Sequence, residues 1–198
     1  MAISSPDEVL AFWFPAGYDA DAPRARAQLT RWFRGQEETD RAVRERFSDT
    51  YEAAVRGELD AWAESPRGRL ALVIVLDQFS RNLRRGSPEA YAQDPKVQRL
   101  VVDGLARGDH KDFGAIELMF FLVALGHSED LAMHDLAQHF TSEMVRRSPA
   151  HLRPLLEFSR AQSAAHRDVV RRFGRHPARN AVLGRTSTPD EERPPPVV

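Results

Sequence analysis

The feature that most restricts the fold is an uninterrupted run of seven apolar residues, 70–76, with the sequence LALVIVL. Its Val-Ile-Val centre would suit a buried β-strand, because β-branched residues are enriched in strands. However, the sequence offers no second convincing strand, and an unpaired strand would leave its backbone hydrogen-bonding groups without partners. We therefore predict that residues 67–79 form a helix that is buried on most sides.

Start and stop signals for helices recur along the rest of the chain. The stretch Ser5-Pro6-Asp7-Glu8 has the residues of a capping box, which predicts that a helix begins here. Pro15 is expected to end this helix. Between Pro15 and Trp32 we expect a loop that contains proline and aspartate. Further helix starts are predicted, from capping residues and their proline or acidic neighbours, at Thr39, Ser87, Asp94, Ser128 and Ser148.

The last of these helices shows the clearest helical periodicity. Its apolar residues recur at intervals of three and four, which is the spacing of one buried helix face. Pro154 near its first turn is expected to move its start a few residues beyond Ser148, and Gly174 is expected to lie just after its end. The predicted buried stripe consists of Leu155, Phe158, Gln162, Ala165, Val169 and Phe173.

Together these signals predict an all-α protein of about eight to ten helices, many of them antiparallel neighbours joined by short loops. A fixed repeat of 34 residues is not found in the sequence. We predict a single domain at residues 1–188. The last ten residues, 189–198, read PDEERPPPVV and are expected to be a flexible, proline-rich tail.

Composition excludes several classes of function. The 198 residues include no cysteine, which excludes a disulfide scaffold, a thiol nucleophile and a cysteine-ligated metal. A formal net charge of −1 argues against a dedicated nucleic-acid binder. The first residues carry acidic groups where a signal peptide would be positive, and no apolar run approaches the ~20 residues that span a bilayer. We therefore expect a cytoplasmic protein without a membrane partner.

The apolar run leads directly into the first cluster of polar residues, LDQFSRNLRRG at 76–86. Asp77 lies on the same helical face as the apolar residues, where an ionised carboxylate is costly unless it is paired. Arg81 is four residues further on and can reach it. In one interpretation the pair is an internal salt bridge that orients the following turn. In the other, Asp77 holds Arg81 so that its guanidinium binds an anion.

A second cluster, GHSED at 126–130, follows a strongly apolar segment. Ser128 is expected to cap the next helix, and the acidic residues after it suit the positive end of the helix dipole. Capping does not explain His127. It lies where a loop leaves a buried helix, which is a common position for site residues. A histidine that merely binds a backbone carbonyl is an equally good interpretation.

A third cluster lies near the C-terminus, in the stretch from His166 to Arg185. His166 flanks the predicted apolar stripe and is expected to be half-buried. Gly174, Pro177 and Asn180 predict a structured turn after the helix. The cluster is rich in arginine, as a solvated helix face also would be, and its arginines are Arg167, Arg171, Arg172, Arg175, Arg179 and Arg185.

Several signatures of chemistry are missing from the sequence. It contains neither the glycine-rich loops that bind nucleotide phosphates nor the HExxH and ExxH patterns of metal sites. The G-x-S-x-G elbow of serine hydrolases is also missing. We therefore predict no cofactor and no metal.

The three clusters also carry a resemblance to a known family. LDQFSRN at 76–82, RG at 85–86, HSED at 127–130 and HRDVVRRFGRHPARNAVLGRTSTPDE at 166–191 occur in one order along the chain, together with the N-terminal VLAFWF. This pattern resembles the bacterial family known as domain of unknown function 924. The resemblance implies a fold similar to tetratricopeptide-repeat proteins, a stack of antiparallel helical hairpins, and no assigned activity. Ser80, His176 and Ala178 depart from the family pattern.

We hypothesise that the clusters meet in one concave pocket for a small anionic or carboxylate-bearing ligand. The candidate proton-transfer residues are His127, Glu129, His166 and Asp77. The candidate ligand-binding residues are Arg81, Asn82, Arg85, Arg175, Arg179 and Asn180. One alternative is an adaptor that binds a peptide or protein on a concave helical face. Another is a purely structural role for the clusters. The sequence does not indicate an oligomeric state.

Overall fold

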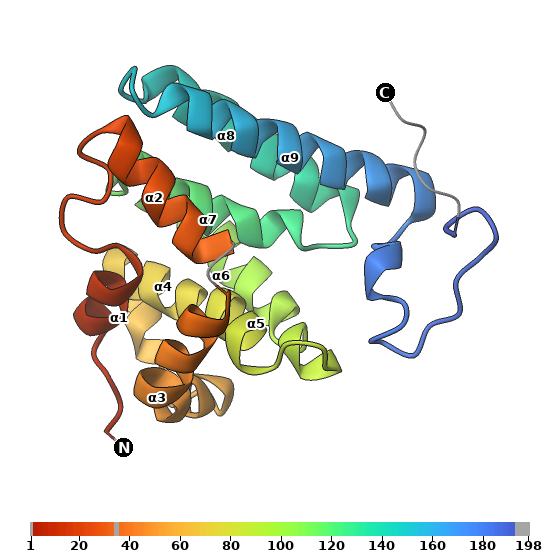
Figure 1. Ribbon diagram of the computed structural model, residues 1–198, viewed down its shortest axis with the longest axis horizontal. Coiled ribbons are helices and arrows are strands. Elements are labelled where there is room, and N and C mark those ends of the chain that lie inside the picture. Colours follow the sequence, from red (N-terminus) through yellow and green to blue (C-terminus); the bar gives the residue numbers. More distant parts are fainter. Residues whose placement is uncertain (1, 34–35, 193–198) are drawn as a thin grey trace.

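The structure is a computed structural model that describes residues 2–33 and 36–192. Within these residues the regular structure is entirely helical, so the predicted all-α class is confirmed (Figure 1). The α-helices are α1 (Pro6–Trp13), α2 (Ala22–Phe33), α3 (Gln36–Val55), α4 (Pro66–Val73), α5 (Ser80–Leu83), α6 (Asp94–Arg107), α7 (Ala115–Gly126), α8 (Leu131–Arg147) and α9 (Arg153–Phe173). Single helical turns are η1 (Asp60–Glu64), η3 (Pro88–Ala90), η4 (Asp109–Lys111) and η5 (Pro177–Arg179), and η2 (Ile74–Phe79) is a π-helical segment.

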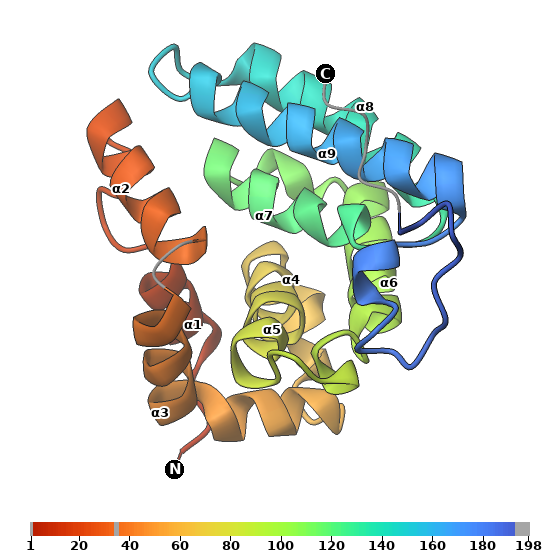
Figure 2. The ribbon, with the colours of Figure 1, turned by 45° about the vertical axis from the view of Figure 1, so that its right-hand side comes forward.

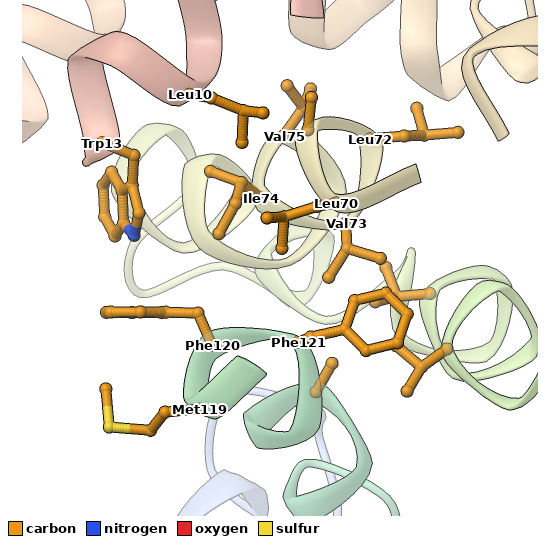
Figure 3. Packing of buried hydrophobic residues seen from close by; sticks show 14 of the residues in the cluster. Leu10, Trp13, Leu70, Leu72, Val73, Ile74, Val75, Met119, Phe120 and Phe121 are labelled. Atoms are coloured by element: carbon orange, nitrogen blue, oxygen red, sulfur yellow. The ribbon is translucent and has the colours of Figure 1, made fainter. Parts of the chain in front are cut away.

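The apolar run forms the centre of the fold. Helix α4 continues through η2 into α5, and each residue from 70 to 76 is at most 1% exposed. This confirms the prediction of a helix buried on most sides. Figure 3 shows why such a helix needs no polar face, because α1 covers it with Leu10 and Trp13 while α7 covers it with Phe120 and Phe121. Helices α3 and α6 close the remaining sides.

The first helix confirms its predicted capping box. The Ser5 hydroxyl accepts a hydrogen bond from the backbone N–H of Glu8 at 3.3 Å, and the Glu8 carboxylate accepts one from the backbone N–H of Ser5 at 2.7 Å. Helix α1 ends at Trp13, two residues before Pro15.

The prediction of a loop between Pro15 and Trp32 is wrong from Ala22 onward, where the chain forms α2. This helix is polar on most of its surface and buries only Ala25 and Trp32, so it has no apolar stripe to reveal it. Its alanines, arginines and glutamine are good helix formers. The predicted start at Thr39 is also wrong, because α3 already begins at Gln36.

Two helices begin after the serine residues that mark their predicted starts. Helix α8 is capped by Asp130, whose carboxylate accepts from the backbone N–H of Ala132 at 2.9 Å, so the assignment of Ser128 as the cap is wrong. Helix α9 begins at Arg153, with Pro154 in its first turn, which confirms the expected delay of its start after Ser148. Its fully buried residues are Leu156 and Val170, one position along from the predicted stripe, and Phe158 is 67% exposed.

The C-terminal third of the chain brings the polar clusters together. Helices α7, α8 and α9 pack against one another, and Figure 1 shows α8 and α9 side by side. Gly174 ends α9 in the left-handed conformation, with φ of 68°. The chain then turns back, and Figure 2 shows this segment beside the end of α6. The stacking typical of tetratricopeptide repeats stays a prediction. Among the described helices, none has the length and apolar character needed to cross a bilayer.

Candidate functional site

A buried carboxylate joins the first two clusters. The side chain of Asp77 is 1% exposed, and its Oδ1 lies 2.7 Å from Nδ1 of His127 and 3.0 Å from Nη1 of Arg81. Burial on its own would raise the pKa of Asp77, but the positive charge of Arg81 and the contact with His127 outweigh it and hold the pKa well below the usual range. The carboxylate is therefore charged at neutral pH.

The π-helical segment helps to place Arg81. The backbone carbonyl of Asp77 accepts a hydrogen bond from Nη1 of Arg81 at 2.9 Å and another from the hydroxyl of Ser80 at 2.8 Å. π-Helical turns are rare and occur often at functional sites, because they disturb the regular backbone pattern. Asp77 pairs with Arg81, four residues further on, as the sequence predicts. The π-helical turn between them was not predicted, because no feature of the sequence indicates it.

A second carboxylate, Asp94, joins the first cluster to the third. Its two oxygens accept from Nη2 of Arg81 at 3.0 and 3.1 Å, and Oδ2 also accepts from Nη1 of Arg179 at 3.2 Å. Burial raises the pKa of Asp94 despite the charge of Arg81, and the nearby Asp77 acts in the same direction. The guanidinium carbons of Arg81 and Arg179 lie 5.5 and 4.7 Å from the ring centre of Tyr91. The two arginines thus share one carboxylate and one aromatic ring.

Glu129 makes a further link between the second and third clusters. Its carboxylate binds Arg185 through two hydrogen bonds of 2.7 and 2.9 Å and accepts the backbone N–H of His176 at 2.8 Å. Burial would raise the pKa of Glu129, but these donors lower it overall. Glu129 therefore anchors the returning C-terminal segment, and its predicted part in proton transfer stays a prediction.

Two buried histidines share one backbone acceptor. Nε2 of His134 and Nε2 of His176 lie 2.9 and 3.0 Å from the carbonyl oxygen of Ser128. Since a carbonyl only accepts, each ring must carry a proton on Nε2. Burial lowers the pKa of both rings, and with the charge of Arg179 it brings that of His176 to about 4. Both rings are therefore neutral at pH 7.

Three groups that can carry a positive charge are more exposed than the buried carboxylates, namely His127, Arg179 and His166, and we call them the cationic layer. The side chains of His127 and Arg179 are 18% and 13% exposed. Among the described residues, Nε2 of His127 has no hydrogen-bond partner, and the guanidinium of Arg179 donates only to Asp94. The ring of His166 lies 5.9 Å from that of His176.

His166 is exposed, so the prediction that it is half-buried is wrong. The inward face of α9 is offset by one position from the predicted stripe, and this turns His166 outward. Neighbouring atoms still desolvate the ring and lower its pKa, and the positive charge of Arg179 acts in the same direction.

Two predicted ligand-binding residues contact a different part of the protein. Nδ2 of Asn82 donates to Asp40 of α3 at 2.7 Å, and Arg85 binds the same carboxylate through hydrogen bonds of 2.8 and 2.9 Å. Their polar groups tie the end of α5 to α3. Their role in ligand binding stays a prediction, and these contacts do not support it.

Arg175 and Asn180 are held by Glu191. Arg175 binds this carboxylate at 2.6 and 2.8 Å, and Nδ2 of Asn180 donates to it at 3.2 Å. With the backbone N–H of Thr188 these contacts lower the pKa of Glu191 to about 2. Glu191 lies just beyond the predicted domain boundary at 188, which stays a prediction. Residues 193–198 of the predicted tail lie outside the described residues.

Sequence reasoning missed several members of the site. Asp94 was interpreted only as a helix start, because its partner Arg179 is 85 residues away in the sequence. Tyr91 likewise had no local signal, and Arg185 was noted only as one arginine of the third cluster. The Ser128 carbonyl could not be recognised as a shared acceptor, because backbone groups leave no trace in the residue pattern.

The predicted concave pocket also stays a prediction. A shallow hollow of about 460 Å³ is lined by residues of α2, none of which is a predicted site residue. Its lining consists of Ala22, Pro23, Arg26, Ala27 and Thr30. Within the described part of the chain, no group of three His, Asp or Glu residues is placed to hold a metal ion.

The pair of Asp77 and His127 can support proton transfer. The charged Asp77 accepts from Nδ1 of His127, which leaves the lone pair of Nε2 to accept a proton from outside. An imidazolium formed in this way would be stabilised by the adjacent carboxylate. Arg179 can meanwhile offer its remaining N–H groups to an oxyanion.

Comparison with known proteins shows the family of the chain and a solved structure with a similar fold. The family described as "Bacterial protein of unknown function (DUF924)" matches residues 9–193. The chain belongs to this family. A solved structure titled "Structure of Protein of Unknown Function ATU0120 from Agrobacterium tumefaciens" is 33% identical, covers 94% of this chain and 93% of that one, and superposes with a TM-score of 0.77. No curated protein matches the chain.

Proposed function

We propose that this member of the DUF924 family binds a small anionic or carboxylate-bearing molecule at the cationic layer of His127, Arg179 and His166. The observation that carries the proposal is the separation of charge. The side chains of Asp77 and Asp94 are 1% and 8% exposed, whereas those of His127 and Arg179 are 18% and 13% exposed. A molecule that approaches from solvent therefore meets donors and positive charge before it meets a carboxylate.

Arg179 is the main anion contact in this proposal. Its guanidinium uses one N–H group on Asp94 and rests on the ring of Tyr91, which limits its rotation. A guanidinium has five N–H donors in a rigid plane, and this geometry matches a carboxylate through two parallel hydrogen bonds. Because the side chain is already positioned, little of its conformational freedom is lost when an anion binds.

His127 is the proton-transfer group if the bound molecule reacts. Asp77 serves as its positioning residue, because the 2.7 Å contact keeps Nε2 of His127 directed away from the buried carboxylate. Arg81 acts below them as a fixed counter-charge, since both of its terminal nitrogens are engaged by Asp77 and Asp94. Whether a reaction takes place depends on the ligand.

A thermal-shift screen tests the proposal. The protein would be screened against carboxylates, phosphate compounds and short peptides, beside the variants Arg179→Gln and His127→Gln. A ligand at 100 times its Kd adds about 2.7 kcal/mol to the stability, which raises the Tm by several degrees. Arg171→Gln is the matched control, because this arginine of α9 is 65% exposed and pairs with its neighbour Asp168. We expect the shift to vanish in Arg179→Gln and to persist in the control.

The same screen separates this proposal from the adaptor alternative. An adaptor would respond to peptides with many contacts and would be indifferent to small anions. If a small anion raised the Tm of Arg179→Gln as much as that of the wild-type protein, the proposed site would be refuted. The cytoplasmic location and the absence of a nucleic-acid partner remain expectations from the sequence.

A further inference from the structure

Helix α9 carries a largely apolar face on its outside. Its members recur at intervals of three or four residues, which places them on one side of the helix. We call this face the outer stripe, and it consists of Phe158, Gln162, Ala165, Val169 and Phe173. The helix packs against α7 and α8, and its fully buried residues, Leu156 and Val170, lie on another side. Figures 1 and 2 show α9 at the edge of the fold.

The outer stripe is not used by the core of a single copy. Phe158 is 67% exposed. Val169 and Phe173 are only partly buried, and within the described part of the chain neither packs against the main hydrophobic core. Exposed apolar side chains that are gathered on one face mark a contact surface, whereas single ones do not. The stripe therefore contributes little to the stability of one copy and is available to a partner.

The order of side chains along the stripe is nearly the same in both directions. A phenylalanine stands at each end, Phe158 and Phe173, and the small Ala165 stands near the middle. When two such helices pack antiparallel about a two-fold axis, Phe158 of one copy lies beside Phe173 of the other. Ala165 then lies close to the axis, where it lets the two backbones approach. A symmetric dimer requires a surface that fits itself in this way.

The charges beside the stripe match under the same symmetry. Glu157 stands at the N-terminal end of the stripe and Arg172 at its C-terminal end, and 15 residues make about four helical turns, so both lie on the same flank. In the antiparallel arrangement Glu157 of one copy comes within reach of Arg172 of the other, and the dimer contains this pair twice. Within one chain these residues pair with Arg160 and Asp190, but both pairs are about half exposed and therefore weak enough to exchange.

We infer that the outer stripe is the docking surface for a second copy of this chain, bound antiparallel through α9 in a two-fold dimer. The inference is independent of the proposed anion site. From Phe158 to Phe173 the stripe is about 22 Å long, at 1.5 Å per residue. One helix from each copy gives an interface smaller than the standard size of about 800 Å² per partner. We therefore expect a weak dimer, with a Kd in the micromolar range.

Sedimentation velocity over a range of protein concentrations tests the dimer. The wild-type protein should pass from monomer to dimer as its concentration rises through the micromolar range. Burial of one phenylalanine contributes about tenfold or more to affinity, and the dimer contains Phe158 twice, so Phe158→Glu should raise the Kd about 100-fold. The variant should fold, because Phe158 is exposed. Ile3→Glu is the matched control, because Ile3 is 49% exposed, lies outside α9 and should leave the Kd unchanged.

A charge exchange tests whether the partner is a second copy in the antiparallel arrangement. Glu157→Arg and Arg172→Glu each place like charges opposite one another and should weaken the dimer, whereas the double variant should restore it. Within one chain the two residues lie about 22 Å apart along α9 and cannot touch, so restoration reports a contact between copies.

Three results would overturn the inference. One is a wild-type protein that stays monomeric up to about 500 μM, or a dimer whose Kd is unchanged in Phe158→Glu. Another is a double variant as weak as its two single variants, since the charges would then not meet across the interface. The third is a dimer that forms only when the chain ends at residue 192, because the last six residues would then be the occupant of the stripe.

Discussion

Replacing His176 with glutamine should make the protein less sensitive to acid. His176 is 9% exposed, and its Nε2 donates to the Ser128 carbonyl at 3.0 Å. Burial and the charge of Arg179 lower its pKa from 6.5 to about 4. The unfolded chain therefore binds a proton at this position between pH 6.5 and 4 while the folded chain does not. Since the unfolded state then holds more protons, this histidine lowers the stability as the pH falls through that window.

The size of the effect follows from the pKa difference. Each pKa unit corresponds to about 1.36 kcal/mol, so complete titration costs about 3 kcal/mol. Between pH 7 and pH 4.5 the expected loss from this residue alone is about 2 kcal/mol. Glutamine does not titrate and carries an N–H donor at a similar reach, so His176→Gln should keep the hydrogen bond and escape the loss.

Urea unfolding at pH 7 and pH 4.5 measures the difference. The wild-type protein should lose about 2 kcal/mol more than His176→Gln between the two pH values. His139→Gln serves as the control, because His139 is exposed and should leave the wild-type acid sensitivity unchanged. Equal losses in the wild-type protein and His176→Gln would show that the buried ring is not the acid-sensitive group.

Three further substitutions or truncations test other contacts. Gly68→Ala should cost several kcal/mol in urea unfolding, because the added Cβ would lie 2.2 Å from a carbonyl oxygen of η1. Gly126→Ala has open space around its Cβ and should instead gain up to ~1 kcal/mol. Equal effects of the two substitutions on stability would refute the close contact at Gly68. Asp94→Asn should lower the free energy of unfolding by about 3 kcal/mol, because it removes a counter-charge from two largely buried arginines. A loss below ~1 kcal/mol would mean that solvent already screens the ion pairs of Asp94. A chain that ends at residue 188 should melt at a lower temperature than one that ends at 192, because it lacks Glu191. Equal melting temperatures would favour the predicted boundary at 188.

The central part of the fold was predictable because its signal is local. An apolar run without a partner strand has to be a buried helix, and the residues from 70 to 76 fulfil this. The capping box at Ser5 is equally local, since both of its hydrogen bonds lie within four residues. Helix α2 escaped prediction because it buries only two side chains, so its apolar pattern is weak.

The site was predictable as a set of motifs but not as a network. Asp77, Arg81 and His127 stood out because polar groups next to apolar helices need partners, and the structure joins them directly. Asp94 and Glu191 were missed as partners, because each balances a charge far away in the sequence. The burial of α9 was misjudged by one position, which was enough to reverse the expected environment of His166.

The most direct test of an anion site at the cationic layer is a crystal structure with selenate, whose anomalous scattering locates it without ambiguity. Selenate should lie within hydrogen-bonding distance of Arg179 and Nε2 of His127, and the same experiment on Arg179→Gln should show the position empty. Selenate found only on exposed arginines of α9, with none at Arg179, would contradict the proposed site.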